Sequence, residues 1–167
     1  SLGVTANDVV ILPSYVCESV VEAVLRTGAR PVFADVGSDL VVNEETVDAA
    51  LTARTRAVIV PHIFGNPAQI DRIEQRLTTR GIALIDDAAQ ALGARCAGRL
   101  IGTFGAAGIL SCGPGKPLAG TGGGLLVTND KTTYNRAAAF PLGKETPAAL
   151  RRRVASFWIT RRWRRYT

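Results

Sequence analysis

The stretch "AVIVPHIFGNPAQIDRIEQRLTTRGIALIDD", residues 57–87, contains one complete strand–helix–strand pattern. Residues 57–60 and 82–85 are short apolar runs, which are typical of strands buried on both faces of a parallel sheet. Between them, residues 68–80 repeat apolar side chains at helical spacing among charged ones, which predicts an amphipathic helix. A helix that joins two such strands makes a parallel βαβ unit. The stretch therefore predicts an α/β fold with a mostly parallel sheet.

The same alternation continues on both sides of this stretch. Further strands are expected at residues 9–12, 30–36, 108–111 and 125–128, and further helices at residues 19–25 and 44–51. Gly28 follows the first of these helices as a C-terminal cap, and Asn43 precedes the second as an N-cap. No repeat or low-complexity linker interrupts the pattern, so we expect one α/β domain with helices flanking a central sheet.

The positive charge of the chain is concentrated near its C-terminal end. The net charge is +6, but seven of the 20 basic residues and no acidic residue lie in residues 151–167. Residues 1–150 hold thirteen basic and fourteen acidic residues, so the body of the chain is close to neutral. A broad polyanion-binding surface needs clustered positive charge, and we therefore expect no nucleic-acid partner.

Cysteine usage and hydropathy favour a soluble, cytoplasmic protein without a metal site. The three cysteines are widely spaced and form no CxxC pair, which argues against a disulfide framework and against zinc. No apolar run is long enough to span a bilayer, and the first residues lack the pattern of a signal peptide. The chain holds no methionine, so we expect it to begin inside a longer polypeptide.

Two carboxylates follow the strand expected at residues 82–85, in the segment "ALIDDAAQALGA". Successive strand residues point to opposite faces, so at most one of Asp86 and Asp87 can face a ligand. Gln90 can reach the same side as Asp87 if the chain turns helically after the strand. A lone aspartate at a strand end is more often a cap or a solvated carboxylate.

We interpret His62, the single histidine, as a structural side chain satisfied at a strand end rather than as a catalyst.

The segment "SCGPGKPLAGTGGGLLVTND", residues 111–130, places one lysine among small residues. Lys116 lies between Gly115 and Pro117, where a planar ligand can approach closely. A partly desolvated lysine loses its proton more readily and becomes a nucleophile toward carbonyl groups. An exposed, solvated lysine is the common alternative, but it leaves Ser111 and the nearby glycines unexplained. A carboxylate, a lysine and a hydroxyl together match pyridoxal phosphate, which needs a protonated ring nitrogen, a Schiff-base amine and a phosphate ligand.

Six stretches resemble one protein family in order and spacing. They are "VVILPSY", "GARPVFADV", "RTRAVIVPHIFGNPAQID", "IALIDDAAQALGA", "GRLIGTFGAAGILS" and "GKPLAGTGGGLLVTND". Over residues 4–130 the chain resembles the DegT/DnrJ/EryC1/StrS family of sugar aminotransferases. This resemblance implies the large domain of a fold type I pyridoxal-phosphate-dependent transferase, with a mostly parallel central sheet and flanking helices.

The resemblance also implies that the chain is truncated at both ends. The family's main phosphate-binding turn would precede residue 1, and its smaller domain would follow residue 167. We accordingly expect residues 1–140 to be a portion of the pyridoxal-phosphate-binding large domain. Residues 141–167 would then be a basic, aromatic, helical tail that leads toward the missing small domain.

The resemblance implies a role for each candidate site residue. Lys116 would be the Schiff-base lysine and the acid/base that moves protons, and Asp87 would partner the pyridinium nitrogen. Gln90 would lie by the phenolic oxygen of the ring, and Ser111 would contact the phosphate. Family members pass an amino group, usually from glutamate, to a keto group on a nucleotide-linked sugar, and they commonly form homodimers. Cys17 departs from the family, which usually sets an aromatic ring against the cofactor face in this turn.

Two other interpretations stay open. A sugar dehydratase of the same fold type is one, although the dehydratases that resemble this chain replace the lysine with histidine, and this chain has Lys116. A non-catalytic remnant whose tail binds a membrane or a partner is the other. The apolar residues that lie among the arginines of the tail are Val154, Phe157, Trp158 and Ile159. For the tail we favour a helix whose packing partner lies outside this chain.

Overall fold

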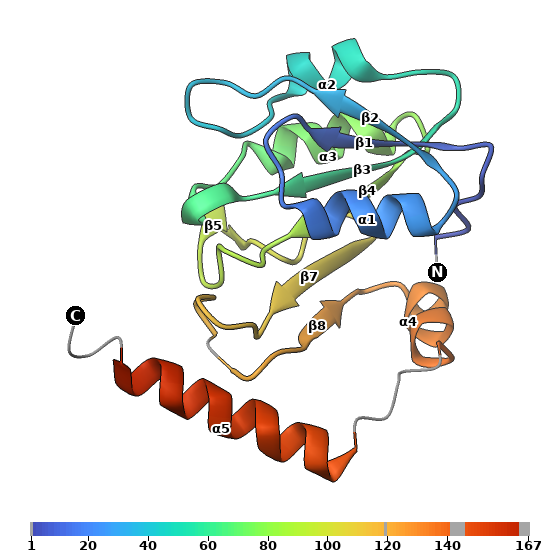
Figure 1. The fold of residues 1–167 in the computed structure, drawn as a ribbon. Helices are drawn as coiled ribbons and strands as arrows, with labels where there is room; N and C mark the ends of the chain where they lie inside the picture. The colour runs from blue at the N-terminus through green and yellow to red at the C-terminus, as the bar shows by residue number, and fades with distance from the viewer. Residues whose placement is uncertain (1, 119, 141–145, 164–167) are drawn as a thin grey trace.

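The computed structural model describes residues 2–118, 120–140 and 146–163 (Figure 1). Its strands are β1 (Val9–Pro13), β2 (Arg30–Ala34), β3 (Thr55–Pro61), β4 (Ala83–Asp87), β5 (Arg95–Cys96), β6 (Arg99–Leu100), β7 (Ala107–Ser111) and β8 (Gly124–Val127). Its helices are α1 (Glu18–Arg26), α2 (Glu44–Ala50), α3 (Ile70–Thr78), α4 (Lys131–Ala138) and α5 (Pro147–Trp163), with the short 3-10 turn η1 (Ile63–Gly65) after β3.

Six of the described strands form one sheet, in the order β2-β1-β3-β4-β7-β8. The pairings from β2 to β7 are all parallel, whereas β8 runs antiparallel to β7. The expected α/β fold with a mostly parallel sheet is therefore confirmed. The chain moves from β1 to one side of the sheet for β2 and returns to the other side for β3. This reversal of strand order opens a crevice at the carboxyl ends of β1 and β3.

Helices cover both faces of the sheet, with α1 on one face and α2 and α3 on the other (Figure 1). Val58 and Val60 of β3 pack in the larger core cluster, which includes Ile70 and Ile73 of α3. Ile59, the residue between them, packs in the second cluster, which holds the apolar side of α1. Because strand residues alternate between faces, a strand with helices on both sides must be apolar throughout. This explains the uninterrupted apolar run in the sequence.

Local capping follows the sequence prediction closely. Asn43 caps α2, with its Oδ1 accepting from the Thr46 N–H at 2.9 Å while the Thr46 hydroxyl oxygen accepts from the Asn43 N–H at 3.2 Å. This reciprocal pair satisfies two donors that a helix N-terminus otherwise leaves unpaired. Gly28, after α1, has a φ of 81°, a left-handed conformation that glycine adopts without steric cost.

One boundary differs from the prediction in a way that shapes the site. The sequence predicts that the strand expected at residues 82–85 ends at Ile85, but in the structure this strand, β4, continues through Asp86 to Asp87. The ladder to β3 extends as far as the Pro61–Asp87 pair, and the ladder to β7 extends to Asp87 as well. Hydrogen bonding on both sides thus holds the two aspartates in extended backbone, a constraint that a local sequence pattern does not contain.

The helix α5 lies within the tail segment and runs apart from the helices that cover the sheet (Figure 1). Val154 is exposed there, whereas the side chains of Phe157, Trp158 and Ile159 lie outside the described residues. Among residues 2–118, 120–140 and 146–163, none of the helices combines the length and apolar character needed to cross a lipid bilayer.

Candidate functional site

A cavity of about 340 Å³ lies at the carboxyl ends of β1, β3, β4 and β7. This volume is within the range of roughly 300 to 1,000 Å³ that is typical of small-molecule sites. The wall is mostly apolar, and Ile59 and Ile109 contribute to it. The polar residues that line the cavity are Cys17, Ser19, His62, Asp87, Gln90, Ser111 and Lys116. The four residues that the sequence analysis selected, Asp87, Gln90, Ser111 and Lys116, are thus brought together around one space.

Asp87 and Lys116 face this space without touching. The Asp87 residue is 8% exposed, and its Oδ1 accepts from the Ala89 N–H at 3.0 Å. Among the described residues, no second donor reaches its carboxylate and no ion pair joins it to Lys116. The two groups nevertheless influence one another, because the Lys116 charge acts to lower the Asp87 pKa. A ligand can therefore lie between a carboxylate on one side and an amine on the other.

Burial dominates the electrostatics of Asp87. Removal of the carboxyl from water raises its pKa above the usual value, and this effect outweighs the Ala89 N–H and the Lys116 charge, which both lower the pKa. A buried carboxylate with an unused oxygen is strongly stabilised by a cationic partner. Asp87 is therefore suited to a ligand atom that carries a proton and a positive charge.

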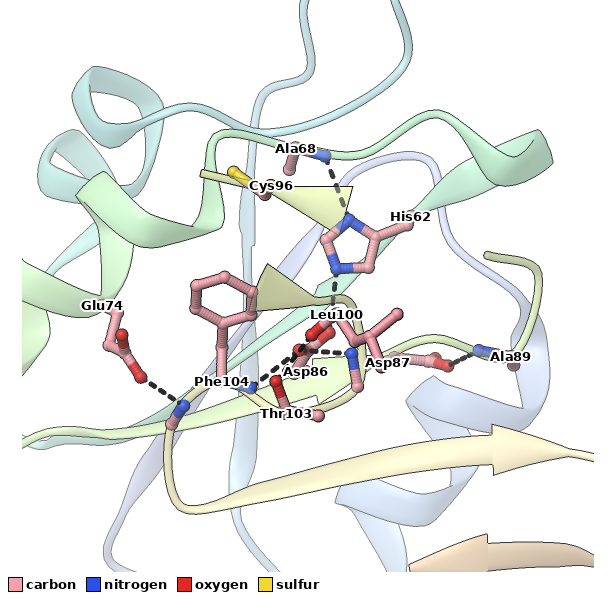
Figure 2. A network of polar contacts seen from close by, with 12 residues as sticks. His62, Ala68, Glu74, Asp86, Asp87, Ala89, Cys96, Leu100, Thr103 and Phe104 are labelled. Atoms are coloured by element: carbon pink, nitrogen blue, oxygen red, sulfur yellow. Dashed lines mark hydrogen bonds and ion pairs between the residues drawn. The ribbon is translucent and has the colours of Figure 1, made fainter. Parts of the chain in front are cut away.

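Asp86 points to the other face of β4 and does not line the cavity (Figure 2). Its Oδ1 lies 2.9 Å from His62 Nε2, and its Oδ2 accepts from the N–H groups of Gly102 at 2.6 Å and Phe104 at 3.0 Å. His62 Nδ1 accepts from the Ala68 N–H at 3.0 Å, so the proton of a neutral imidazole must lie on Nε2, which donates to Asp86. Both side chains are fully buried.

This network has two consequences for the predictions. His62 is a satisfied structural side chain, as the sequence analysis expected, although it also contributes one edge to the cavity. Of the two aspartates, Asp87 lines the cavity and Asp86 does not, as the alternation of strand side chains predicts. By tying the end of β4 to the loop that contains Gly102 and Phe104, Asp86 fixes the strand on which Asp87 is presented.

Gln90 and Ser111 complete the part of the site that the sequence analysis identified. Gln90 lies in the turn after β4, where its Oε1 accepts from the Phe64 N–H at 3.1 Å. Ser111 ends β7, and its Oγ accepts from the Gly113 N–H at 3.3 Å. The Ser111 hydroxyl proton remains available to an acceptor in the cavity, because a hydroxyl can donate and accept at once.

The segment that precedes α1 was not among the predicted site residues. Cys17 immediately precedes the helix, and its Sγ accepts a hydrogen bond from the Ser19 hydroxyl at 3.3 Å. The hydrogen bonds from Ser19 lower the pKa of this thiol, and the Lys116 charge lowers it further. The signal for its place at the cavity was already in the sequence: Cys17 lies four residues after β1, in the turn that the family resemblance sets against the cofactor face.

Comparisons with known proteins support the same assignment. The model of the DegT/DnrJ/EryC1/StrS aminotransferase family matches residues 1–151. A dTDP-3-amino-3,4,6-trideoxy-alpha-D-glucose transaminase from Micromonospora megalomicea subsp. nigra is 40% identical over 135 residues, which are 80% of this chain and 36% of that protein. The chain spans about a third of the length of the curated relatives that it matches.

Solved structures of aminotransferases and of a related dehydratase are also similar to this chain. An aminotransferase from Psychrobacter cryohalolentis superposes with a TM-score of 0.80 at 31% identity, over 83% of this chain and 36% of that one. A GDP-4-keto-6-deoxy-D-mannose-3-dehydratase from E. coli with bound hydrated PLP superposes with a TM-score of 0.75 at 27% identity, over 81% of this chain and 35% of that one.

Proposed function

The chain belongs to the DegT/DnrJ/EryC1/StrS aminotransferase family, and we propose that the complete protein is a pyridoxal-phosphate-dependent aminotransferase. It transfers an amino group, with glutamate as the donor, to the keto group of a nucleotide-linked sugar. The relationship between Asp87 and Lys116 supports the proposal most directly, because a buried carboxylate and an amine that has no ion-pair partner among the described residues line one cavity. The nucleotide-sugar names of the relatives support the substrate class.

The residues of the cavity fit pyridoxal phosphate. Asp87 offers an unused carboxylate oxygen to the protonated ring nitrogen, and its burial makes that pairing strong. Gln90 and Ser111 offer hydrogen-bond donors to oxygen atoms of the same ligand. When bound, the group supplies an electron sink that lets an amino group leave one substrate and join another.

Lys116 has two tasks in this proposal. Its amine would hold the cofactor, and the same amine would serve as the general acid/base that moves a proton during amino transfer. Gly113 and Gly115 precede it, and the Lys116 N–H donates to the Gly113 carbonyl oxygen at 3.2 Å. The φ of Gly115 is 79°, so the backbone makes a tight turn here, and Lys116 lines the cavity. The apolar wall from Ile59 and Ile109 limits water around these steps.

The remaining features of the proposal concern the whole protein. Residues 1–140 contribute part of the cofactor-binding large domain, and residues 141–167 form a helical tail that leads to a smaller domain. The protein acts as a homodimer in the cytoplasm. An analytical ultracentrifugation experiment on the complete protein tests the dimer, and a monomer at micromolar concentration would contradict it.

A labelling experiment tests the central claim. The complete protein is incubated with pyridoxal phosphate and reduced with borohydride, and the attachment site is mapped by peptide mass spectrometry. We expect the label on Lys116 and its loss in Lys116→Ala. Lys131→Ala is the matched control, because Lys131 is an exposed lysine at the start of α4. The Lys131→Ala protein should carry the label on Lys116 as the wild type does. Label absent from Lys116 in the unmodified protein would refute the proposal.

A dehydratase is the second candidate, because a solved dehydratase is among the similar structures. The presence of Lys116 favours the aminotransferase. Product analysis separates the two: the aminotransferase forms an amino sugar only when an amino donor is present and converts that donor stoichiometrically to its keto acid. A deoxy-keto sugar as the product, with the donor oxidised to its keto acid and its nitrogen released as ammonia instead of kept on the sugar, would favour the dehydratase.

A further inference from the structure

Phe64 has an unusual backbone conformation at the rim of the cavity. Its φ of 54° and ψ of 21° lie in the left-handed region, which a bulky residue rarely occupies without support from its surroundings. The residue is 72% exposed, so burial of the ring does not provide that support. The neighbouring Tyr15 ring lies 6.3 Å away, centroid to centroid, and is also exposed.

The turn that carries Phe64 is anchored at both ends. His62, which precedes it, is held by Asp86 and by the Ala68 N–H, and its carbonyl oxygen accepts from the Gly65 N–H at 3.3 Å. Asn66, which follows, donates through Nδ2 to the Asp39 carbonyl oxygen at 3.2 Å. These contacts fix the direction of the Phe64 N–H, which points to Gln90.

The contact from Phe64 determines which way the Gln90 carboxamide faces. A backbone N–H can only donate, so its partner at 3.1 Å must be the carboxamide oxygen and not the nitrogen. Gln90 itself lines the cavity with Lys116 and Asp87. With its oxygen engaged by Phe64, the group that Gln90 can offer to a ligand is its NH₂.

We propose that Phe64 is a positioning residue whose left-handed backbone holds the Gln90 carboxamide so that its NH₂ donates to an acceptor oxygen of the ligand. This inference rests on the proposed function for the identity of that ligand. The close fit of the turn supports it, because a Cβ on Gly65 would lie 3.3 Å from the Gln90 carbonyl oxygen. The turn and Gln90 therefore pack as one unit.

Two substitutions distinguish the effect of the Phe64 backbone conformation from the effect of its aromatic ring. Phe64→Asn and Phe64→Val both remove the ring, but asparagine tolerates the left-handed region whereas β-branched valine does not. Two readouts are used on the complete protein: hydrogen exchange of the residue 64 amide without cofactor, and the dissociation constant of pyridoxal phosphate. We expect Phe64→Asn to match the wild type within about twofold in both.

In Phe64→Val we expect loss of exchange protection at residue 64 and about tenfold weaker cofactor binding, as for a lost hydrogen bond to a charged acceptor. Gln90→Ala should show the same two losses, and the double variant should bind no more weakly than Gln90→Ala alone. Equal effects of Phe64→Asn and Phe64→Val would overturn the proposal. It would also be overturned if the loss of cofactor affinity in the double variant equalled the product of the losses in Phe64→Val and Gln90→Ala.

Gln90→Glu gives a test that does not depend on the folding of Phe64→Val. A carboxylate still accepts from the Phe64 N–H, so exchange protection should persist, but it offers the ligand an acceptor instead of a donor. We expect at least tenfold weaker cofactor binding. Lost protection, or unchanged binding, would overturn the inference. Failure of the proposed function is distinguishable, because it appears as absence of the borohydride label on Lys116 in the wild type.

Discussion

Asp86 and Asp87 are adjacent in the chain, yet their carboxylates serve opposite sides of β4. Asp86 closes a buried network with His62, and Asp87 faces the cavity that Lys116 also lines. The structural carboxylate is fully hydrogen-bonded, whereas the one that faces the cavity keeps an oxygen unused among the described residues. The two positions should therefore respond in opposite ways to the same substitution.

Asp86→Asn should destabilise the fold. The carboxylate accepts from three donors, and an asparagine would direct its own NH₂ at one of them, which leaves a buried donor without a partner. We expect a loss of about 2 kcal/mol or more in the free energy of unfolding, measured by urea denaturation. Asp35→Asn, at an exposed position, serves as the control and should change stability by less than about 0.5 kcal/mol.

Asp87→Asn should leave the cofactor-free protein as stable as the wild type or slightly more stable at neutral pH, while it abolishes amino transfer. Burial raises the pKa of Asp87, so the folded state binds its proton more tightly than the unfolded state does. The wild type should thus lose stability relative to Asp87→Asn as pH rises from about 4, the unfolded value, through the raised folded pKa. Denaturation of both proteins between pH 4 and pH 8 measures this difference, and a gain of the wild type over the variant with rising pH would contradict it.

Cys17 should be the thiol that alkylating reagents modify faster than Cys96. Hydrogen bonds from Ser19 lower the pKa of the exposed Cys17, whereas burial raises the pKa of Cys96, whose Sγ lies 3.1 Å from Asp71 Oδ1. Because the thiolate is the reactive form, we expect at least about tenfold faster modification at pH 7.5, followed by peptide mass spectrometry.

Two further measurements test the cause of that reactivity. Ser19→Ala should slow the modification of Cys17, since it removes the hydroxyl that donates to the sulfur. Pyridoxal phosphate should also protect Cys17, since the thiol lines the proposed site. Equal rates of alkylation at Cys17 and Cys96 would show that the local hydrogen bonds do not control the reactivity of the Cys17 thiol.

Gly108→Ala should disrupt the junction between β7 and the Asp86 network. A Cβ at this position would collide with the backbone of Gly102, whose N–H donates to Asp86. We expect a loss of about 1 to 3 kcal/mol, as for other overpacked sites, in thermal or urea denaturation. Gly113→Ala is the matched control, because its Cβ would meet the Ser111 Oγ at an ordinary 3.5 Å, and its stability should stay close to that of the wild type.

The features that depend on local periodicity could be predicted from the amino-acid sequence alone. The apolar runs and the helical spacing between them identified the βαβ units, and Asn43 and Gly28 marked helix ends. The alternation of strand side chains predicted that Asp86 and Asp87 point to opposite faces. These features could be predicted because each involves residues only a few positions apart, whose relative directions follow from backbone geometry.

The contacts between distant segments, in contrast, depend on the folding of the whole domain. The order of the strands brings Cys17 and Lys116 to one cavity, lets the Gln90 carboxamide accept from the Phe64 N–H and joins His62 to the loop at Gly102 through Asp86. These pairs are far apart along the chain, and their contact depends on sheet order, register and the space left between layers of side chains. Such quantities arise from packing over the whole domain, so no short segment of the sequence contains them.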